Sequence, residues 1–397
     1  MTQDTISPTA ARWIGRWLIV IALMVYAMIL IGGATRLTDS GLSITEWAPI
    51  SGTLPPLSEA AWLSEFEKYK ATAEYQQQNY NMTIGEFQFI YWWEWGHRLF
   101  GRLIGLVAVG GFVWFAAQRW LNRTWALRLL FLIALGGLQG FIGWWMVASG
   151  IGETTRVDVA PYRLMTHFGL ALFIIAVTAW FWFDLRRSEG AHRSVQPASP
   201  DAAVRNNGVA ALSGTPTRWL SPIALVLMVT LFIQMLTGAL VAGLDAGRTY
   251  TDWPLMAGEL VPRYYIDEQL GVRSLFEGRA ATQFNHRFLA YAIWIGSIAA
   301  AIVYWRSAYG RAFAVLAGLV TLQALWGIYT LVSAAPLELA LVHQGLGVIV
   351  LLASVRLAFQ VVHDASSLRV ESNVPGSAKT TTSPFSERPA IKTTPLP

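Results

Sequence analysis

Cysteine is absent from this chain of 397 residues, and charged residues make up only 13% of it. The absence of cysteine excludes disulfides, thiolate zinc sites, iron–sulfur clusters and cysteine nucleophiles. Low charge together with 54% hydrophobic residues is atypical of soluble domains. The formal net charge of +5 does not come from a run of Lys and Arg interleaved with aromatics, so we expect no nucleic acid partner.

The hydrophobic residues lie in eight stretches, each about long enough to cross a bilayer. They cover residues 14–34, 97–118, 126–148, 162–184, 219–243, 285–305, 311–333 and 338–361. Many of the 19 Trp lie near the ends of these stretches, as expected for residues at a membrane interface. The first stretch has no small-residue cleavage site after it, which favours a retained helix over a signal peptide. The sequence therefore predicts an all-α integral membrane protein with eight transmembrane helices.

Three polar segments divide the chain. Residues 35–96 form a long loop with an acidic, helical piece at 62–75, inside an N-terminal half that covers 1–184. Residues 185–218 have the composition of a flexible linker, and the C-terminal half then covers 219–363. The Ser/Thr/Pro-rich residues 364–397 are expected to be a disordered tail.

The distribution of charge predicts the orientation of the helices in the membrane. Basic residues outnumber acidic ones in the N-terminus, the linker, the tail and the two short connections that share their side. Acidic residues outnumber basic ones in the four remaining connections. Both termini are therefore predicted to be cytoplasmic, with the loops at 35–96 and 244–284 on the outside.

Polar landmarks recur in order in the two halves. Asp39, Gly41, Thr45 and Trp47 reappear 206 positions later as Asp245, Gly247, Thr251 and Trp253. Further pairs are His97-Arg98 with His286-Arg287, Leu138-Gln139 with Leu322-Gln323, and His167 with His343. Because each half has an even number of helices, the halves should have the same topology and be related by a pseudo-two-fold axis along the membrane normal.

Four of the six histidines, His97, His167, His286 and His343, lie near the outer ends of the even-numbered hydrophobic stretches. A single histidine in a membrane helix is usually held by a hydrogen bond to a neighbouring helix. Four at matching positions favour metal ligation instead, with two facing imidazoles binding one haem iron. We pair His97 with His167 and His286 with His343, while a pair with one ligand from each half remains open.

Charged residues next to these histidines differ between the halves. Arg98 and Arg287 each follow a histidine, where they would bind haem propionates or merely reach the membrane interface. Glu94 lies three residues before His97, whereas Gln283 occupies that place before His286. A carboxylate beside a haem can accept protons or stabilise positive charge, and an amide cannot titrate. The alternative is a rim carboxylate that pairs with an arginine.

The presence of Glu94 in one half and of Gln283 in the other predicts one reactive haem site and one site for electron transfer. Two further polar residues, Gln139 and Gln323, lie within hydrophobic stretches and are predicted to form hydrogen bonds between helices.

The sequence resembles the haem A synthase family across nearly all of its membrane part. The motifs that carry the resemblance are Gly32-Gly-Ala-Thr-Arg36, Gly41-Leu-Ser-Ile-Thr-Glu-Trp47, Glu94-Trp-Gly-His-Arg98, Gln139-Gly-Phe-Ile-Gly143, Asn285-His-Arg287 and His343-Gln344. The resemblance implies two four-helix bundles. It also implies oxidation of the C8 methyl group of haem O to the formyl group of haem A, by two successive hydroxylations, with haem b as cofactor.

By this resemblance, haem b is held by His286 and His343 with Arg287 nearby, and the substrate haem lies near His97 and His167. Arg98 and the catalytic Glu94 belong to that substrate site. Some members of the family carry a cysteine pair in the first outer loop, and this chain has none, so a thiol-dependent step cannot operate here. We expect water to supply the oxygen and electrons to pass to the C-terminal haem.

Two other functions remain as alternatives. A bis-histidine b-type cytochrome that only transfers electrons would hold two permanent haems, and a parallel-repeat transporter would use the histidines as proton relays. The expected partners are haem O, a haem O synthase upstream, and cytochrome oxidase with its assembly factors downstream; a homo-oligomer stays open. The N-terminus lacks transit-peptide character, which favours the bacterial inner membrane, with haem sites toward the periplasm.

Overall fold

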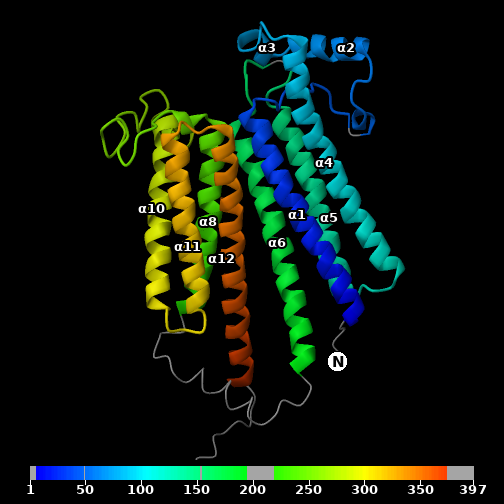
Figure 1. Cartoon of the computed structure of the whole chain (residues 1–397), viewed down its shortest axis with the longest axis vertical. Coiled ribbons are helices and arrows are strands. Elements are labelled where there is room, and N and C mark those ends of the chain that lie inside the picture. Colours follow the sequence, from blue (N-terminus) through cyan, green and yellow to red (C-terminus); the bar gives the residue numbers. More distant parts are fainter. Residues whose placement is uncertain (1–5, 49, 153, 195–218, 373–397) are drawn as a thin grey trace, which may run out of the picture.

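The computed structural model describes residues 6–48, 50–152, 154–194 and 219–372, and this part of the chain contains eight helices suited to crossing a membrane (Figure 1). They are α1 (Pro8–Leu37), α4 (Ile84–Ala117), α5 (Arg123–Val147), α6 (Pro161–Ser194), α8 (Leu220–Gly243), α10 (Arg279–Val303), α11 (Gly310–Val332) and α12 (Leu337–Ser372). The described residues contain no β-strand, only an isolated bridge between Met256 and Glu259. The predicted class, an all-α membrane protein with eight spanning helices, is confirmed.

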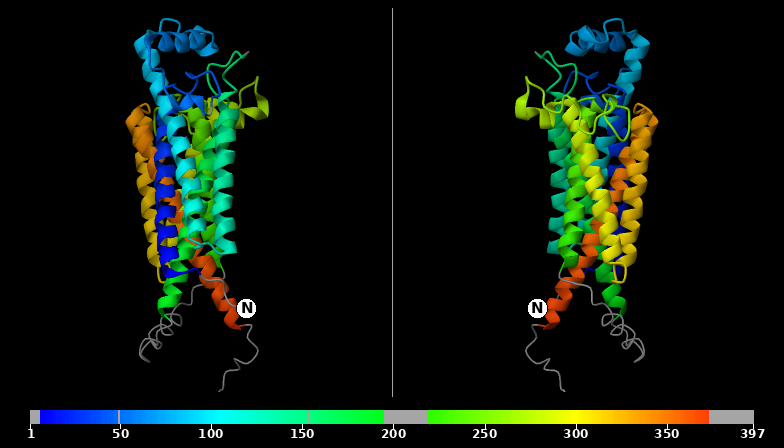
Figure 2. Two further views of the ribbon diagram at one scale, coloured as in Figure 1. Left: turned by 90° about the vertical axis from the view of Figure 1, so that its right-hand side faces the viewer. Right: turned by 90° about the vertical axis from the view of Figure 1, so that its left-hand side faces the viewer.

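Three of these helices extend ten residues or more beyond their hydrophobic stretches at one end. α4 begins at Ile84 rather than near residue 97, because Thr83 and Glu86 form a reciprocal capping box at its first turn. Figures 1 and 2 show α6 and α12 reaching beyond the other helices at the opposite end. Residues 185–194 and 364–372, which the sequence assigned to the linker and tail, thus continue these helices. No proline interrupts them before Pro197 and Pro375. The rest of both segments, 195–218 and 373–397, lies outside the described residues.

Each half is a closed four-helix bundle. In the N-terminal half the contacts run α1–α4–α5–α6 and return to α1, and in the C-terminal half they run α8–α10–α11–α12 and return to α8. The halves meet where α6 contacts α8 and α12, and where α1 contacts α12 (Figure 1). Val348, Leu351 and Val355 of α12 belong to the same buried apolar cluster as α1 and α6. The two bundles are therefore joined by a shared apolar core, and their equivalent contacts agree with the predicted internal repeat.

A helical cap covers the N-terminal end of α4, at the top of Figures 1 and 2, and we call the end of the molecule that carries this cap the outer end. It consists of α2 (Glu59–Lys70) and α3 (Ala73–Gln77) and is the helical piece expected in the first loop. Phe66 and Tyr69 of the cap stack on Phe87 of α4, with ring centroids 5.0 and 5.3 Å away. This aromatic cluster explains why α4 remains ordered well beyond the bilayer-sized part of its sequence.

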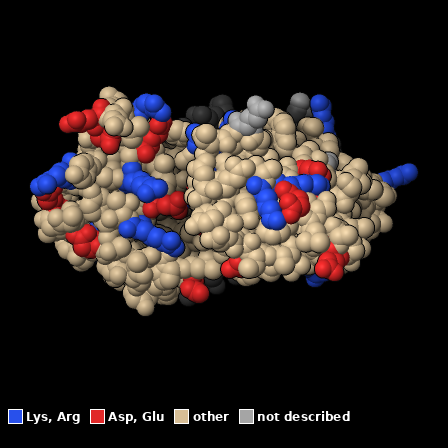
Figure 3. Space-filling view, turned by 90° about the horizontal axis from the view of Figure 1, so that it is seen from above, with Lys and Arg blue, Asp and Glu red and all other residues tan. Residues whose placement is uncertain are grey.

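Short helical turns order the remaining outer segments. They are η1 (Ser51–Thr53) in the first loop, and η3 (Ala246–Arg248), η4 (Gly271–Arg273) and α9 (Ser274–Glu277) between α8 and α10. Seen from above, the outer face carries both signs of charge close together rather than a patch of one sign (Figure 3). Ion pairs such as Lys68 with Glu65, 2.8 Å apart, account for part of this mixture.

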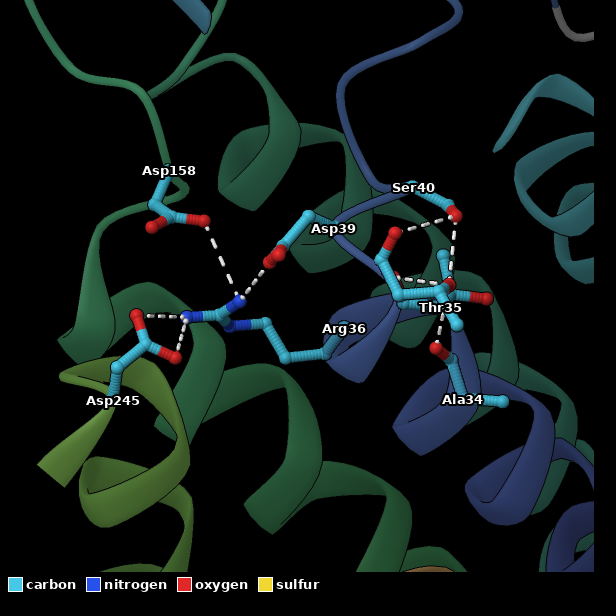
Figure 4. A network of polar contacts seen from close by, with 8 residues as sticks. Ala34, Thr35, Arg36, Asp39, Ser40, Asp158 and Asp245 are labelled. Carbon is cyan, nitrogen blue, oxygen red and sulfur yellow. Dashed lines mark hydrogen bonds and ion pairs between the residues drawn. The ribbon is translucent and has the colours of Figure 1, made fainter. Parts of the chain in front are cut away.

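A single arginine joins both halves at this face. Arg36, at the outer end of α1, bonds to Asp39 at 2.7 Å and to Asp245 of the C-terminal half at 3.0 Å (Figure 4). Its third carboxylate, Asp158, lies 3.5 Å away in the α5–α6 connection. The Arg36 side chain is only 11% exposed, so these three carboxylates compensate a largely buried charge. Burial in turn raises the pKa of the Asp158 carboxyl, against the opposing effect of Arg36.

Candidate haem sites

Two imidazoles face each other within the N-terminal bundle. The rings of His97 on α4 and His167 on α6 have centroids 6.5 Å apart, with 29° between their planes. A metal–imidazole bond of about 2 Å on each side of one metal ion would place two opposite ring centroids about 6 Å apart. The separation of His97 and His167 therefore matches two imidazoles that bind one haem iron from opposite faces.

The corresponding residues of the C-terminal bundle lie on the matching helices. His286 is on α10 and His343 on α12, which take the places of α4 and α6 in the contacts of the bundle. His167, His286 and His343 each lie about two turns from the start of their helix, at the outer end of the bundle. His97 lies deeper in the sequence of α4 only because that helix extends outward to Ile84.

Each imidazole packs against a glycine of the neighbouring helix. A Cβ atom on these glycines would lie close to Cε1 of the ring: 3.0 Å for Gly32 and His97, 2.9 Å for Gly143 and His167, 3.1 Å for Gly238 and His286, and 2.7 Å for Gly327 and His343. Ordinary contacts of a Cβ begin at 3.4 Å. Because these glycines of α1, α5, α8 and α11 have no Cβ, each leaves the space that one imidazole ring occupies. We call each of these four positions a glycine seat.

Three of the four imidazoles also have a glutamine partner. The side-chain nitrogens of Gln139, Gln234 and Gln323 lie 3.2, 3.1 and 3.2 Å from Nδ1 of His167, His286 and His343, respectively. Each also donates to the backbone carbonyl of the same histidine, at 3.0, 3.0 and 2.9 Å. The predicted interhelical hydrogen bonds of Gln139 and Gln323 are confirmed.

Sequence reasoning missed Gln234, although a spacing could have found it. Each of the three glutamines lies four residues before the glycine that seats its histidine. In each case the glutamine side-chain oxygen is buried and has no hydrogen bond partner. A histidine that binds a metal through one ring nitrogen needs an acceptor for the N–H of the other. In the observed orientation the amide nitrogen, not this oxygen, faces Nδ1, so the oxygen would take that role only after the amide turns over. The facing rings and their glycine neighbours fit ligated histidines.

The donor set fits haem better than a bare metal ion. Among the described residues there is no group of three or more His, Asp or Glu placed to hold a metal ion. A bare Zn²⁺ site takes three or four protein ligands, whereas the porphyrin itself supplies four nitrogens and leaves two axial positions. Pairs of imidazoles in seats made of glycine suit those two axial positions.

Glu94 is held rigidly above the N-terminal pair. It is 3% exposed, and its Oε2 accepts hydrogen bonds from Ser43 Oγ at 2.8 Å and from the Ile44 backbone N–H at 2.7 Å. Its Oε1 accepts from Arg98 at 2.6 Å. The alternative of a carboxylate paired with an arginine thus describes the geometry, and Ser43 is a partner that the sequence did not reveal. These three donors fix the orientation of the carboxylate.

Arg98 and Arg287 bind the outer loops in the same way. Arg98 donates to the carbonyls of Ile44 and Glu46, at 2.9 and 3.1 Å. Arg287 donates to the carbonyls of Tyr250 and Asp252, 206 positions later, at 2.7 and 3.0 Å. Both guanidinium groups therefore brace a loop over a histidine pair, and their expected role in binding propionates stays a prediction.

Glu94 accepts a hydrogen bond from Arg98, whereas its counterpart Gln283 bonds to the loop. Gln283, in the place of Glu94, donates to the Tyr250 carbonyl at 2.9 Å, and its own Oε1 is buried without a partner. The amide binds the loop by donating to a carbonyl, whereas the carboxylate binds it by accepting from an N–H. Similar backbones thus carry an ionisable group in one half and a neutral group in the other.

Comparison with known proteins shows which family this chain resembles. Residues 15–355 match the COX15-CtaA family, described as cytochrome oxidase assembly protein. A protein of Hyphomonas neptunium named haem A synthase is 64% identical over 89% of this chain and 95% of its own length. Proteins of the same name from Dinoroseobacter shibae and Paracoccus denitrificans are each 46% identical. The match with the Dinoroseobacter protein covers 92% of both chains. The match with the Paracoccus protein covers 83% of this chain and 82% of the relative.

Proposed function

We propose that this chain, which belongs to the COX15-CtaA family of cytochrome oxidase assembly proteins, is a haem A synthase that oxidises the C8 methyl group of haem O to a formyl group. One observation carries the proposal beyond family membership. Two equivalent histidine–arginine frameworks differ in that Glu94 lies over one and Gln283 over the other. A protein that only held two haems would have no need of this difference.

The substrate haem binds in the N-terminal bundle, between His97 and His167. Each hydroxylation takes one water, adds its oxygen to the methyl carbon, and releases two electrons and two protons. The second hydroxylation gives a geminal diol, which loses water to become the formyl group. Glu94 stabilises the developing cation at the methyl carbon and accepts a proton, because it is a buried carboxylate three residues before His97 on α4.

The C-terminal bundle holds the cofactor. Haem b, bound between His286 and His343, would supply one-electron transfer toward an external acceptor. The described residues around that site hold the haem ligands in place and offer no group that could transfer a proton. Gln234 and Gln323 fix the two imidazoles, and Gln283 presents an amide that takes no part in proton transfer.

The location follows from the eight spanning helices and from the bacterial relatives. The protein belongs in the bacterial inner membrane with its outer loops, and hence both haem sites, toward the periplasm. Haem O arrives from a haem O synthase, and haem A leaves to assembling cytochrome oxidase.

A bis-histidine cytochrome is the second candidate, because the glycine seats are equivalent in the two halves. It predicts two tightly held haem b groups and no modified porphyrin. Extraction and mass analysis of the pigments in the purified protein separate the two functions. Haem O or haem A beside haem b supports the synthase, and haem b alone supports the cytochrome.

The residue-level test is Glu94→Gln in cells that make haem O. Loss of a positioned general base typically costs about 10²- to 10⁴-fold in rate, so haem A should fall by at least that lower factor while haem O accumulates. Glu67→Gln on the exposed side of α2 is the matched control, since its carboxylate is 66% exposed. Undiminished haem A in Glu94→Gln, at wild-type protein levels, would remove Glu94 from the mechanism.

A further inference from the structure

One of the four imidazoles lacks the support that the other three have. His167, His286 and His343 each have a glutamine amide beside Nδ1, and His286 has Thr237 Oγ1 at 2.9 Å as well. The His97 ring packs against Gly32, but no hydrogen bond joins it to any described residue.

The internal repeat shows what replaces the missing partners. Gly32 and Gly238 are 206 positions apart, and the same offset places Met28 where Gln234 stands and Ile31 where Thr237 stands. The Met28 methyl group reaches α4, 3.5 Å from where a Cβ on Gly101 would lie. Gly101 is one turn beyond His97, so Met28 projects toward α4 just as Gln234 projects toward α10.

Neither a thioether nor an alkyl side chain can donate a hydrogen bond to an imidazole, and neither accepts one with useful strength. In metal sites such hydrogen bond partners fix the tautomer and the orientation of the ring, and removing them typically costs about 10- to 100-fold in metal affinity. The bond between His97 and a haem iron should therefore be the weakest of the four, by about that factor.

The two sites need opposite properties if one holds a cofactor and the other turns over a substrate. A resident haem requires two well-supported ligands, whereas a haem that enters, reacts and leaves requires one bond that opens readily. The geometry points to His97 as that exchangeable ligand, with Met28 and Ile31 as the positioning residues that keep its imidazole without hydrogen bond partners. This inference rests on the proposed function, because it takes the N-terminal haem to be the substrate.

Exchange of the haem can be measured without turnover. The full-length protein in nanodiscs is loaded with haemin, and the transfer of haemin to excess apomyoglobin is followed by its Soret band. The variant Met28→Gln with Ile31→Thr installs both partners beside His97. It should slow the release from the N-terminal site by at least about tenfold and retain a second haem equivalent during purification.

The reciprocal change guards against a variant that misfolds. Gln234→Met with Thr237→Ile should speed haem release from the C-terminal site by at least about tenfold. Val229→Met, on a half-exposed position of α8, controls for added methionine and should change neither rate.

Three outcomes decide the matter. Slower release in the first variant and faster release in the second support the inference. Wild-type release rates in both double variants, with both proteins folded and haem-bound, overturn it. If the rates follow the partner residues but wild-type cells make no haem A, the exchangeable ligand stands and the synthase proposal fails.

Discussion

The substitution Gly327→Ala tests whether the backbone of α11 determines where His343 lies. The added Cβ would lie 2.7 Å from Cε1 of the imidazole, closer than Cβ atoms are found to approach other atoms. To restore an ordinary contact of at least 3.4 Å, the ring must move by 0.7 Å or more. Metal–ligand distances are usually held within about 0.2 Å, so the displaced imidazole would no longer reach the same iron position.

We therefore expect Gly327→Ala to lose most of its haem b, while Gly238→Ala, with a Cβ 3.1 Å from His286, should lose less. Gly318→Ala, on the same helix, is the matched control, because a Cβ there meets no atom within 4 Å. It should bind haem b normally and gain up to about 1 kcal/mol of helix stability.

The assay is the pyridine haemochromogen content per mole of purified protein, together with the low-spin signal of the ferric protein. A full haem b complement with an unchanged spectrum in Gly327→Ala would refute the idea that glycine seats position the ligands. Equal losses in Gly327→Ala and Gly318→Ala would show instead that α11 merely tolerates substitution poorly.

Three further predictions concern the outer face. Burial raises the pKa of the Glu74 carboxyl to about 8, above its ordinary value of 4.5, so the folded cap keeps a proton that the unfolded chain releases. The cap should therefore lose stability as the pH rises between these values, and Glu74→Gln should abolish this dependence in hydrogen exchange of α2 and α3. Arg36→Gln should lower the free energy of unfolding by about 1–3 kcal/mol, measured by thermal denaturation, whereas exposed Arg248→Gln should not. Thr83→Ala should speed hydrogen exchange in the first turn of α4, since it removes a cap worth about 1 kcal/mol.

The eight helices could be predicted because a bilayer requires long apolar stretches, which are a local property of the sequence. The start of α4 could not be predicted in that way. Its outer turns are held by a capping box and by aromatic residues of α2, which are contacts outside the apolar stretch. The helical ends of α6 and α12 were missed for the same reason, since polar residues there continue a helix that the membrane part has already nucleated.

The histidines were visible from their spacing, but their environment was only partly so. The sequence identified Gln139 and Gln323 as polar residues in apolar helices. Gln234 escaped notice because its counterpart in the repeat is Met28, so no matching pair marked it. Ser43, which bonds to Glu94, lies 51 residues away in the sequence, and only the folded loop brings the two together.

The differences that bear on the proposed mechanism lie on one helix pair. The His167 side of the N-terminal site keeps its glycine seat and its glutamine, as both sides of the C-terminal site do. The departures, Met28, Ile31 and Glu94, all belong to α1 and α4, next to His97. Because Glu94 and His97 share α4, opening of the iron–His97 bond would free the haem face that lies on the side of the carboxylate. In the proposed mechanism, exchange of the haem and oxidation of its methyl group would then both depend on α4. Changes in two helices of a duplicated bundle would suffice to make one haem site reactive and leave the other for electron transfer.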